Sequence, residues 1–348
     1  MTKATKTVKA TKPKNRKYSL KYSLVFLKNQ TILSHTFVKT FMMKQIFIIG
    51  IGLWAIVLWG CYNAPSQDSP SRALPAQTGV LAHQDTEGVQ KTVVLTAWDT
   101  VLAQKIAVVG KGKTRAARWQ LAITSFLGTP YLENTLDHNA IEQLVIEPDK
   151  LDCWTFIESS LALFLCSEMK DATTQDYAHF IQRMRYRNGK IDGYGSRIHY
   201  FTDWMVQAAE NGWLQDVTRD CGGEDIQKNI SFMTAFPNGY PHLSDNTAFQ
   251  QVLAAEKRLS ERHYVYLPKS KLADWEHTIH AGDLIALTTP IEGLDVVHQG
   301  WAVKRDGRIY LLHATSVGKR QVIVSKKPLV DYMKGISEQN GVIIMRLK

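Results

Sequence analysis

Apolar residues recur at helical spacing through the middle of the chain. Within residues 152–166 they repeat at steps of three and four, the period of one face of a helix: Ile157, Leu161, Phe164 and Leu165. Similar stripes occur in other segments, and several of them end at a glycine. We therefore predict helices over residues 97–108, 113–126, 152–166, 174–186, 200–211 and 248–262.

The pattern changes after residue 263 to short runs that are rich in β-branched and aromatic residues. These runs predict strands over residues 264–267, 283–288, 296–304, 308–313, 322–325 and 342–347. Helices first and strands afterwards are typical of an α+β domain with an antiparallel sheet. We therefore predict that fold class.

A two-residue Asp-Gly turn at 306–307 joins two of these strands and sets their register. With this turn, His313 lies opposite Gly300, and His298 lies opposite Thr315. Opposed residues point to the same side of a sheet, so both imidazoles project from one face as diagonal neighbours. One strand histidine is usually a packed core residue, but two on one face indicate a candidate site.

Charge is unevenly distributed along the chain. The net charge is +10, yet residues 1–42 hold ten Lys or Arg and no acidic residue, so the rest of the chain is neutral. This distribution argues against nucleic acid as a partner. Either translation starts at Met42 or Met43, or residues 1–42 are a genuine basic tail.

An apolar run of 14 residues, 46–59, follows the basic segment. It is short for a transmembrane helix, which needs roughly 20 residues, but it fits a secretory signal. The run ends before Gly60 and Cys61, a pattern that resembles a bacterial lipoprotein signal in which Cys61 is lipidated. A plain signal peptide or an uncleaved anchor is the alternative.

We divide the chain accordingly into three parts. Residues 1–60 form the leader with its signal segment, and residues 61–90, rich in Pro, Ser, Gln and Ala, form a flexible tether. Residues 91–348 form a single domain, with a helical insert over about 170–262. We expect this domain to act as a monomer.

Cys166 and Cys221 either pair in a disulfide or stay free. The chain has no C-x-x-C or paired-histidine motif that would indicate zinc. We therefore expect neither a metal nor another cofactor.

Cys153 stands at the start of the predicted 152–166 helix, directly after the natural N-cap Asp152. The helix dipole and the free amides of a first turn favour a thiolate, which is the nucleophilic form of cysteine. A buried structural cysteine is the simpler interpretation of this position taken alone.

Several segments together resemble the NlpC-type, papain-like superfamily of bacterial cell-wall cysteine hydrolases. In chain order they are GTPY at 128–131, LDC at 151–153, GDL at 282–284, VHQGW at 297–301 and LHA at 312–314. The sequence LDCWTFIE at 151–158 is similar to the branch of N-acetylmuramoyl-L-alanine amidases. Trp154 departs from the pattern, because a smaller residue is more usual there.

The resemblance implies a papain-like, NlpC-type fold in which the nucleophile helix packs on the antiparallel sheet. It implies that Cys153 is the nucleophile, that His298 transfers protons, and that His313 orients His298. The backbone N–H of Cys153 and the hydroxyl of Tyr131 would hold the oxyanion; a tyrosine packed under its turn is the alternative. Three residues grouped before a predicted helix are candidates for binding sugar or peptide: Arg197, His199 and Tyr200.

The implied activity is hydrolysis of the amide between N-acetylmuramic acid and L-alanine in peptidoglycan fragments (muropeptides). The implied location is the bacterial cell envelope, on the periplasmic side or at the surface, with a lipid anchor in the membrane. Three other functions stay open: a γ-D-glutamyl endopeptidase of the stem peptide, a non-catalytic lipoprotein that binds peptidoglycan, and a transglutaminase or general papain-like protease.

Overall fold

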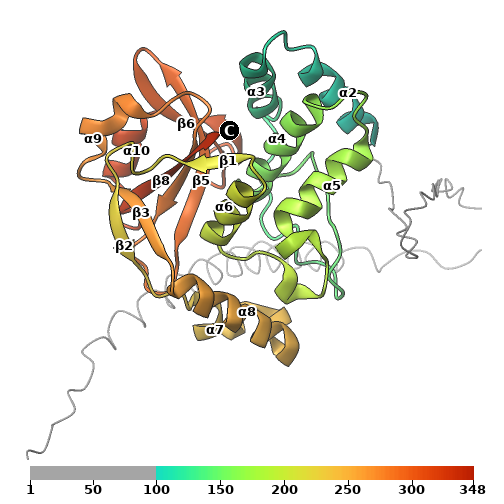
Figure 1. Cartoon of the computed structure of the whole chain (residues 1–348), viewed down its shortest axis with the longest axis vertical. Coiled ribbons are helices and arrows are strands. Elements are labelled where there is room, and N and C mark those ends of the chain that lie inside the picture. The colour runs from blue at the N-terminus through green and yellow to red at the C-terminus, as the bar shows by residue number, and fades with distance from the viewer. Residues whose placement is uncertain (1–98) are drawn as a thin grey trace, which may run out of the picture. The chain divides into compact units, whose positions relative to one another are not determined.

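The computed structural model describes residues 99–348, in which an antiparallel sheet lies between two groups of helices (Figure 1). The strand order is β2-β3-β8-β4-β5-β6-β7, and β1 pairs with β8 beside this path. The strands are β1 (Leu214–Asp216), β2 (Glu224–Gln227), β3 (His263–Pro268), β4 (Leu284–Thr288), β5 (Val296–Arg305), β6 (Arg308–Thr315), β7 (Gln321–Val324) and β8 (Gly341–Leu347).

Helices precede most of the strands, as the sequence predicts. They are α2 (Asp99–Gly110), α3 (Arg115–Thr124), α4 (Cys153–Ser167), α5 (Thr174–Arg185), α6 (Phe201–Glu210), α7 (Phe232–Ala235), α8 (Asn246–Ser260), α9 (Leu272–Trp275) and α10 (Leu329–Lys334). Short 3-10 turns cover Arg187–Gly189, Tyr194–Ser196, Pro237–Gly239, Pro241–Ser244 and Glu276–Thr278. The predicted α+β class with an antiparallel sheet is confirmed.

Each face of the sheet has its own apolar core. On one face, α4 packs through Phe156, Leu163 and Phe164 into a core that includes Trp301 of β5. The indole of Trp301 donates a 2.7 Å hydrogen bond to Ser160 Oγ, which ties α4 to β5. This packing brings α4 against β5 and β6, the two strands that carry the histidines.

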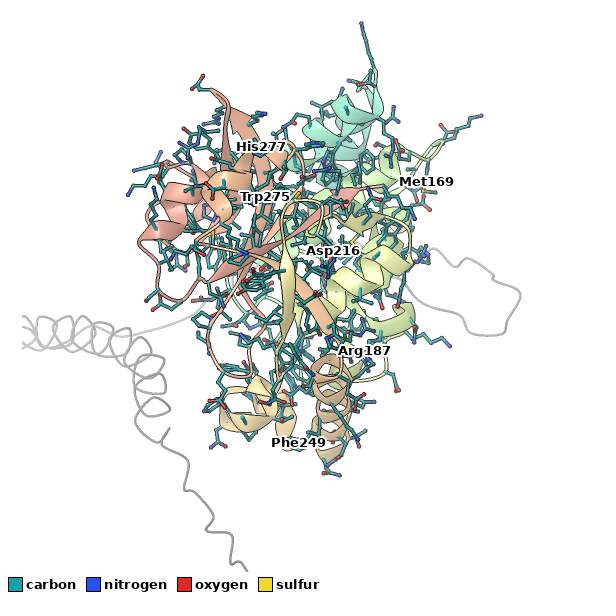
Figure 2. The ribbon with its side chains drawn as sticks, turned by 60° about the vertical axis from the view of Figure 1, so that its left-hand side comes forward. Met169, Arg187, Asp216, Phe249, Trp275 and His277 are labelled. Atoms are coloured by element: carbon teal, nitrogen blue, oxygen red, sulfur yellow. The ribbon has the colours of Figure 1, made fainter. Side chains whose placement is uncertain are left out.

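The opposite face is covered by α9 and α10, which contribute Leu272, Leu329 and Met333 to a second core. Figure 1 shows these two helices on the side of the sheet away from α3 to α6. Trp275 at the end of α9 stacks on His277, and Figure 2 labels both. α10 is the element of this layer that reaches the candidate site.

The predicted Asp-Gly hairpin between β5 and β6 is confirmed. Asp306 and Gly307 have φ values of 49° and 77°, the left-handed conformation that a tight hairpin turn requires. The predicted register holds from Arg305 opposite Arg308 to Trp301 opposite Leu312. Beyond that pair the ladder between β5 and β6 has no further partners, while β6 pairs with β7 along its other edge as far as Thr315 opposite Gln321. The two strands therefore separate just before the histidines.

The insert differs from the prediction in one respect. Residues 170–262 are mainly helical, but they also contain β1 and β2, which pair with β8 and β3. Both strands are short, and exposed residues dominate their pattern, so their sequence carries no apolar alternation. β1 and β2 are extended because they pair with strands that lie far away in the sequence.

The predictions for the leader, the tether and Cys61 concern residues outside 99–348 and stay predictions. Within residues 99–348, no helix is both long enough and apolar enough to cross a membrane.

Candidate active site

α4 begins at Cys153 because Asp152 caps it, as predicted. The Asp152 carboxylate accepts hydrogen bonds from the amides of Trp154 (2.9 Å) and Thr155 (2.7 Å), and the Thr155 hydroxyl accepts from the Asp152 amide (2.9 Å). The Phe156 amide bonds to the Asp152 carbonyl. Of the four first-turn amides, only that of Cys153 is not bound to Asp152, so it is available to an incoming oxygen atom.

The first-turn amides favour the thiolate of Cys153 as predicted, but the surroundings of the thiol outweigh them. Burial raises the pKa of the Cys153 thiol above its ordinary value, and the negative charge of Asp152 raises it further. The amides of Cys153, Trp154 and Gln299 act in the opposite direction but do not outweigh burial. Cys153 is therefore a neutral thiol that needs a base to activate it.

The two histidines meet as predicted, although the ladder between β5 and β6 ends before them. His298 Nε2 lies 2.6 Å from His313 Nδ1, and the rings are nearly perpendicular, with centroids 4.9 Å apart. Burial lowers the pKa of His313 to about 4, and burial together with His313 lowers the pKa of His298 from 6.5 to about 3. Both imidazoles are therefore neutral near pH 7 and joined by one N–H···N hydrogen bond.

The thiol of Cys153 lies beside the strand that carries His298. The amide of Gln299, the next residue along β5, interacts with Cys153. Because Nε2 of His298 is bound to His313, Nδ1 is the nitrogen of His298 left for a proton from the thiol. The arrangement therefore provides a thiol, a base and a partner for that base.

Tyr131 flanks this group on the side of the helix start. Its backbone pairs with Leu151, two residues before Cys153, and its phenol interacts electrostatically with Cys153. Burial raises the pKa of Tyr131, and the nearby carboxylate of Asp152 raises it further, so the hydroxyl stays protonated. A protonated phenol can donate a hydrogen bond, as the oxyanion role requires.

The three predicted substrate-binding residues use their polar groups within the protein. Arg197 forms ion pairs with Asp137 and Glu142. Nε2 of His199 is hydrogen bonded to the Tyr194 carbonyl at 2.9 Å. Further contacts of this kind come from Tyr200, whose hydroxyl donates a 2.6 Å bond to Glu256 and accepts one from the Met233 amide. These contacts support a structural role for all three residues, and substrate binding stays a prediction without support from the geometry.

The first residues of α6 contact both halves of the site, which the sequence did not indicate. The ring of Phe201 packs edge-on against Trp154, with centroids 5.0 Å apart, and Trp154 adjoins Cys153. The amide and hydroxyl of Thr202 each donate a 2.8 Å bond to buried Asp295, three residues before His298. The start of α6 therefore sets the position of the segment that holds Cys153 relative to the strand that holds His298.

A second residue that the sequence did not indicate is Tyr332 of α10. Its ring lies edge-on to His313, with centroids 5.6 Å apart, and its phenol interacts electrostatically with Cys153. α10 is six residues long, too short for a periodic pattern to reveal it. Tyr332 therefore encloses the histidine pair from the α10 side of the sheet.

The other described cysteines take no part in this site. Cys166 and Cys221 are buried and free, so the open question of their pairing is answered for this structure. Across residues 99–348, no group of three or more His, Cys, Asp or Glu side chains could hold a metal ion.

Comparison with solved structures finds close matches. An N-acetylmuramoyl-L-alanine amidase from Bacteroides uniformis is 37% identical, with a TM-score of 0.62 over 66% of this chain and 98% of that one. A putative xylanase from Bacteroides fragilis is 39% identical, with a TM-score of 0.62 over 65% and 99%. A Legionella pneumophila protein, 19% identical with a TM-score of 0.53 over 72% and 94%, shares the fold. Comparison with curated protein sequences finds no match.

Fold, site and relatives together define the chain as an amidase, an enzyme that hydrolyses carbon–nitrogen amide bonds. More narrowly, residues 122–341 match the model of the AmiA-like family, described as N-acetylmuramoyl-L-alanine amidase-like, and the chain belongs to that family. The matched range contains every residue of the candidate active site.

Proposed function

We propose that the protein hydrolyses the amide between the lactyl group of N-acetylmuramic acid and L-alanine in peptidoglycan fragments. The observation that carries this proposal is the His298–His313 hydrogen bond beside the Cys153 thiol, in a chain of the amidase-like family. A nucleophile at a helix start and its base on the adjoining sheet also support the NlpC-type, papain-like relationship that the sequence suggests.

In the first half of the reaction, Cys153 sulfur attacks the lactyl carbonyl carbon while its proton passes to Nδ1 of His298. The oxygen of the tetrahedral intermediate accepts hydrogen bonds from the Cys153 amide and the Tyr131 hydroxyl. The His298 imidazolium then returns the proton to the alanine nitrogen as the C–N bond breaks. The peptide leaves with a free amine, and the lactyl group stays on Cys153 as a thioester.

In the second half, water attacks the thioester carbonyl and gives a proton to His298. When the C–S bond breaks, this proton returns to sulfur, which regenerates the thiol and releases the sugar with a free lactyl carboxyl group, which then loses its proton to solvent. His313 accepts the N–H of His298 Nε2 throughout, so that it fixes the ring orientation and stabilises the imidazolium. The neutral resting state makes His298 a general base rather than one half of a permanent ion pair.

Mass spectrometry of digested muropeptides tests the position of the cut. The proposal predicts free N-acetylmuramic acid and an intact peptide that begins with L-alanine, with no product in a sample without protein. A γ-D-glutamyl endopeptidase would leave L-alanyl-D-glutamate on the sugar. A binding protein would leave the substrate whole, and either result would contradict the proposal.

The pH dependence of turnover tests the state of His298. Because its folded pKa is lowered to about 3, the base stays neutral as pH falls below 6.5, the ordinary pKa of histidine. We therefore expect the acidic limb of the kcat/KM profile to lie below pH 6.5. The measurement is kcat/KM between pH 4 and 8, on the order of two points per unit.

Protein stability is measured in parallel, because the same buried histidines affect folding. A lowered folded pKa means that the unfolded chain binds protons first, so the free energy of unfolding falls as pH drops below 6.5. Loss of activity therefore counts only where the thermal midpoint still exceeds the assay temperature. An acidic limb at or above pH 6.5 in folded protein would show that the pKa of His298 is not lowered.

A further inference from the structure

The turn between β6 and β7, residues 316–320, lies against the nucleophile side of the candidate site. Its last residue, Arg320, accepts a 2.8 Å hydrogen bond at its carbonyl from the amide of Tyr131. Next to it, the amide of Val322 donates a 2.8 Å bond to the carbonyl of Thr129. Because the backbone of Tyr131 also pairs with Leu151, these bonds connect the turn to the segment that leads into Cys153.

Arg320 is an exposed cation with no acidic partner. Its guanidinium carbon lies 5.6 Å from the centre of the Tyr131 ring. Within the described part of the chain, no carboxylate forms an ion pair with Arg320. Most of the other described arginines have an acidic partner, as Arg197 and Arg346 do. The positive charge is therefore available to a ligand at the edge of the site.

The backbone of Arg320 is also unusual. Its φ is 48°, in the left-handed region where a long side chain is disfavoured by about 1 kcal/mol or more. The backbone bond to Tyr131 holds this conformation. Strained residues of this kind are found at ligand-binding positions, and the guanidinium of Arg320 lies over the phenol that interacts with Cys153.

The distribution of negative charge on the substrate identifies the group that the Arg320 guanidinium can bind. In the substrate of the proposed function, the lactyl carboxyl is consumed in the scissile amide, so the sugar carries no charge. All carboxylates lie on the peptide. The nearest is the free α-carboxylate of the D-glutamate that follows L-alanine, since this residue continues the peptide through its γ-carboxyl.

We propose that Arg320 binds this α-carboxylate and thereby makes the enzyme prefer D-glutamate over its neutral amide, D-isoglutamine, at the second position of the peptide. The inference rests on the proposed function. An arginine–carboxylate contact that forms in the transition state supports discrimination of about tenfold to a hundredfold. Arg320 would then be a specificity-determining residue on the peptide side of the scissile bond.

Two substrates test the proposal, N-acetylmuramoyl-L-alanyl-D-glutamate and N-acetylmuramoyl-L-alanyl-D-isoglutamine, which differ only at the α-carboxyl. We expect wild type to hydrolyse the first with a kcat/KM about tenfold or more above the second. We expect Arg320→Asn to lower kcat/KM for the first to nearly that for the second, and to leave the second nearly unchanged. Asparagine is the chosen replacement because it tolerates the left-handed backbone.

Lys319→Asn is the matched control, since it removes the neighbouring exposed charge. The proposal requires the preference to survive in this variant. A wild type without preference, an Arg320→Asn variant that keeps it, or an equal loss in Lys319→Asn would overturn the role of Arg320 while the amidase function stands. Release of N-acetylmuramic acid from neither substrate by wild type would overturn the proposed function as well.

Discussion

Replacement of Cys153 by alanine is expected to abolish hydrolysis of muropeptides while the protein stays folded. In the proposed mechanism the sulfur forms the covalent intermediate, so its removal should lower kcat by on the order of 10⁴-fold or more, to the level of water attack in the same pocket. The side chain lies at the first position of a helix whose cap is made by Asp152 and Thr155. Stability should therefore change by less than about 1 kcal/mol. Product release followed by mass spectrometry and a thermal melt measure the two effects.

Cys166→Ala provides the control for this variant. Cys166 is also free and lies on the same helix, but it is buried in the core at the other end of α4. This substitution can lower stability through a small cavity, yet activity should persist in the folded protein. Turnover retained in Cys153→Ala, or lost in folded Cys166→Ala, would contradict the role of Cys153.

Replacement of Glu158 by alanine is expected to cause the largest loss of stability. Glu158 is fully buried on α4, and its carboxylate accepts bonds of 2.9 and 2.7 Å from the guanidinium of Arg185. Burial raises the pKa of Glu158, whereas the charge and two hydrogen bonds of Arg185 oppose this rise. Without the carboxylate, Arg185 is a buried cation with no acidic partner, which costs about 3–5 kcal/mol.

The loss should appear as a fall of roughly 10 °C in the thermal midpoint, at about 2–4 °C per kcal/mol for a domain of this size. Glu168→Ala is the matched control at the other end of α4. Glu168 pairs with Arg115 and Arg118 but is partly exposed, so its removal should cost less than about 1 kcal/mol. Equal effects of the two substitutions in a thermal melt would refute the distinction between the buried and the surface pair.

The features that the sequence predicted well depend on neighbours along the chain. The start of α4 follows from Asp152 and Thr155, which bind amides within three residues of themselves. The meeting of His298 and His313 follows from a two-residue turn that determines the pairing on both sides of it. In both cases, local geometry restricts the chain before any tertiary contact forms.

The features that the sequence missed depend on distant contacts. The pKa of Cys153 rises because segments packed around the helix start and the charge of Asp152 disfavour the thiolate. Arg197 looks like a ligand for substrate, but its acidic partner Asp137 lies 60 residues earlier in a segment without periodicity. The ladder between β5 and β6 ends at Trp301 and Leu312, although the turn alone would extend it to the histidines. None of these is encoded by spacing within one element.

The contacts of α6 have a consequence for how this enzyme can be altered. Phe201 packs on Trp154, and Thr202 binds Asp295. These two contacts of α6 set the distance between the proposed nucleophile and the proposed base. Tyr200, one residue earlier, donates a hydrogen bond to Glu256 of α8. The far end of the insert is therefore connected to the same helix start. A chimera that receives a relative's insert therefore acquires a new distance between the proposed nucleophile and base together with a new surface. The two properties cannot be exchanged separately.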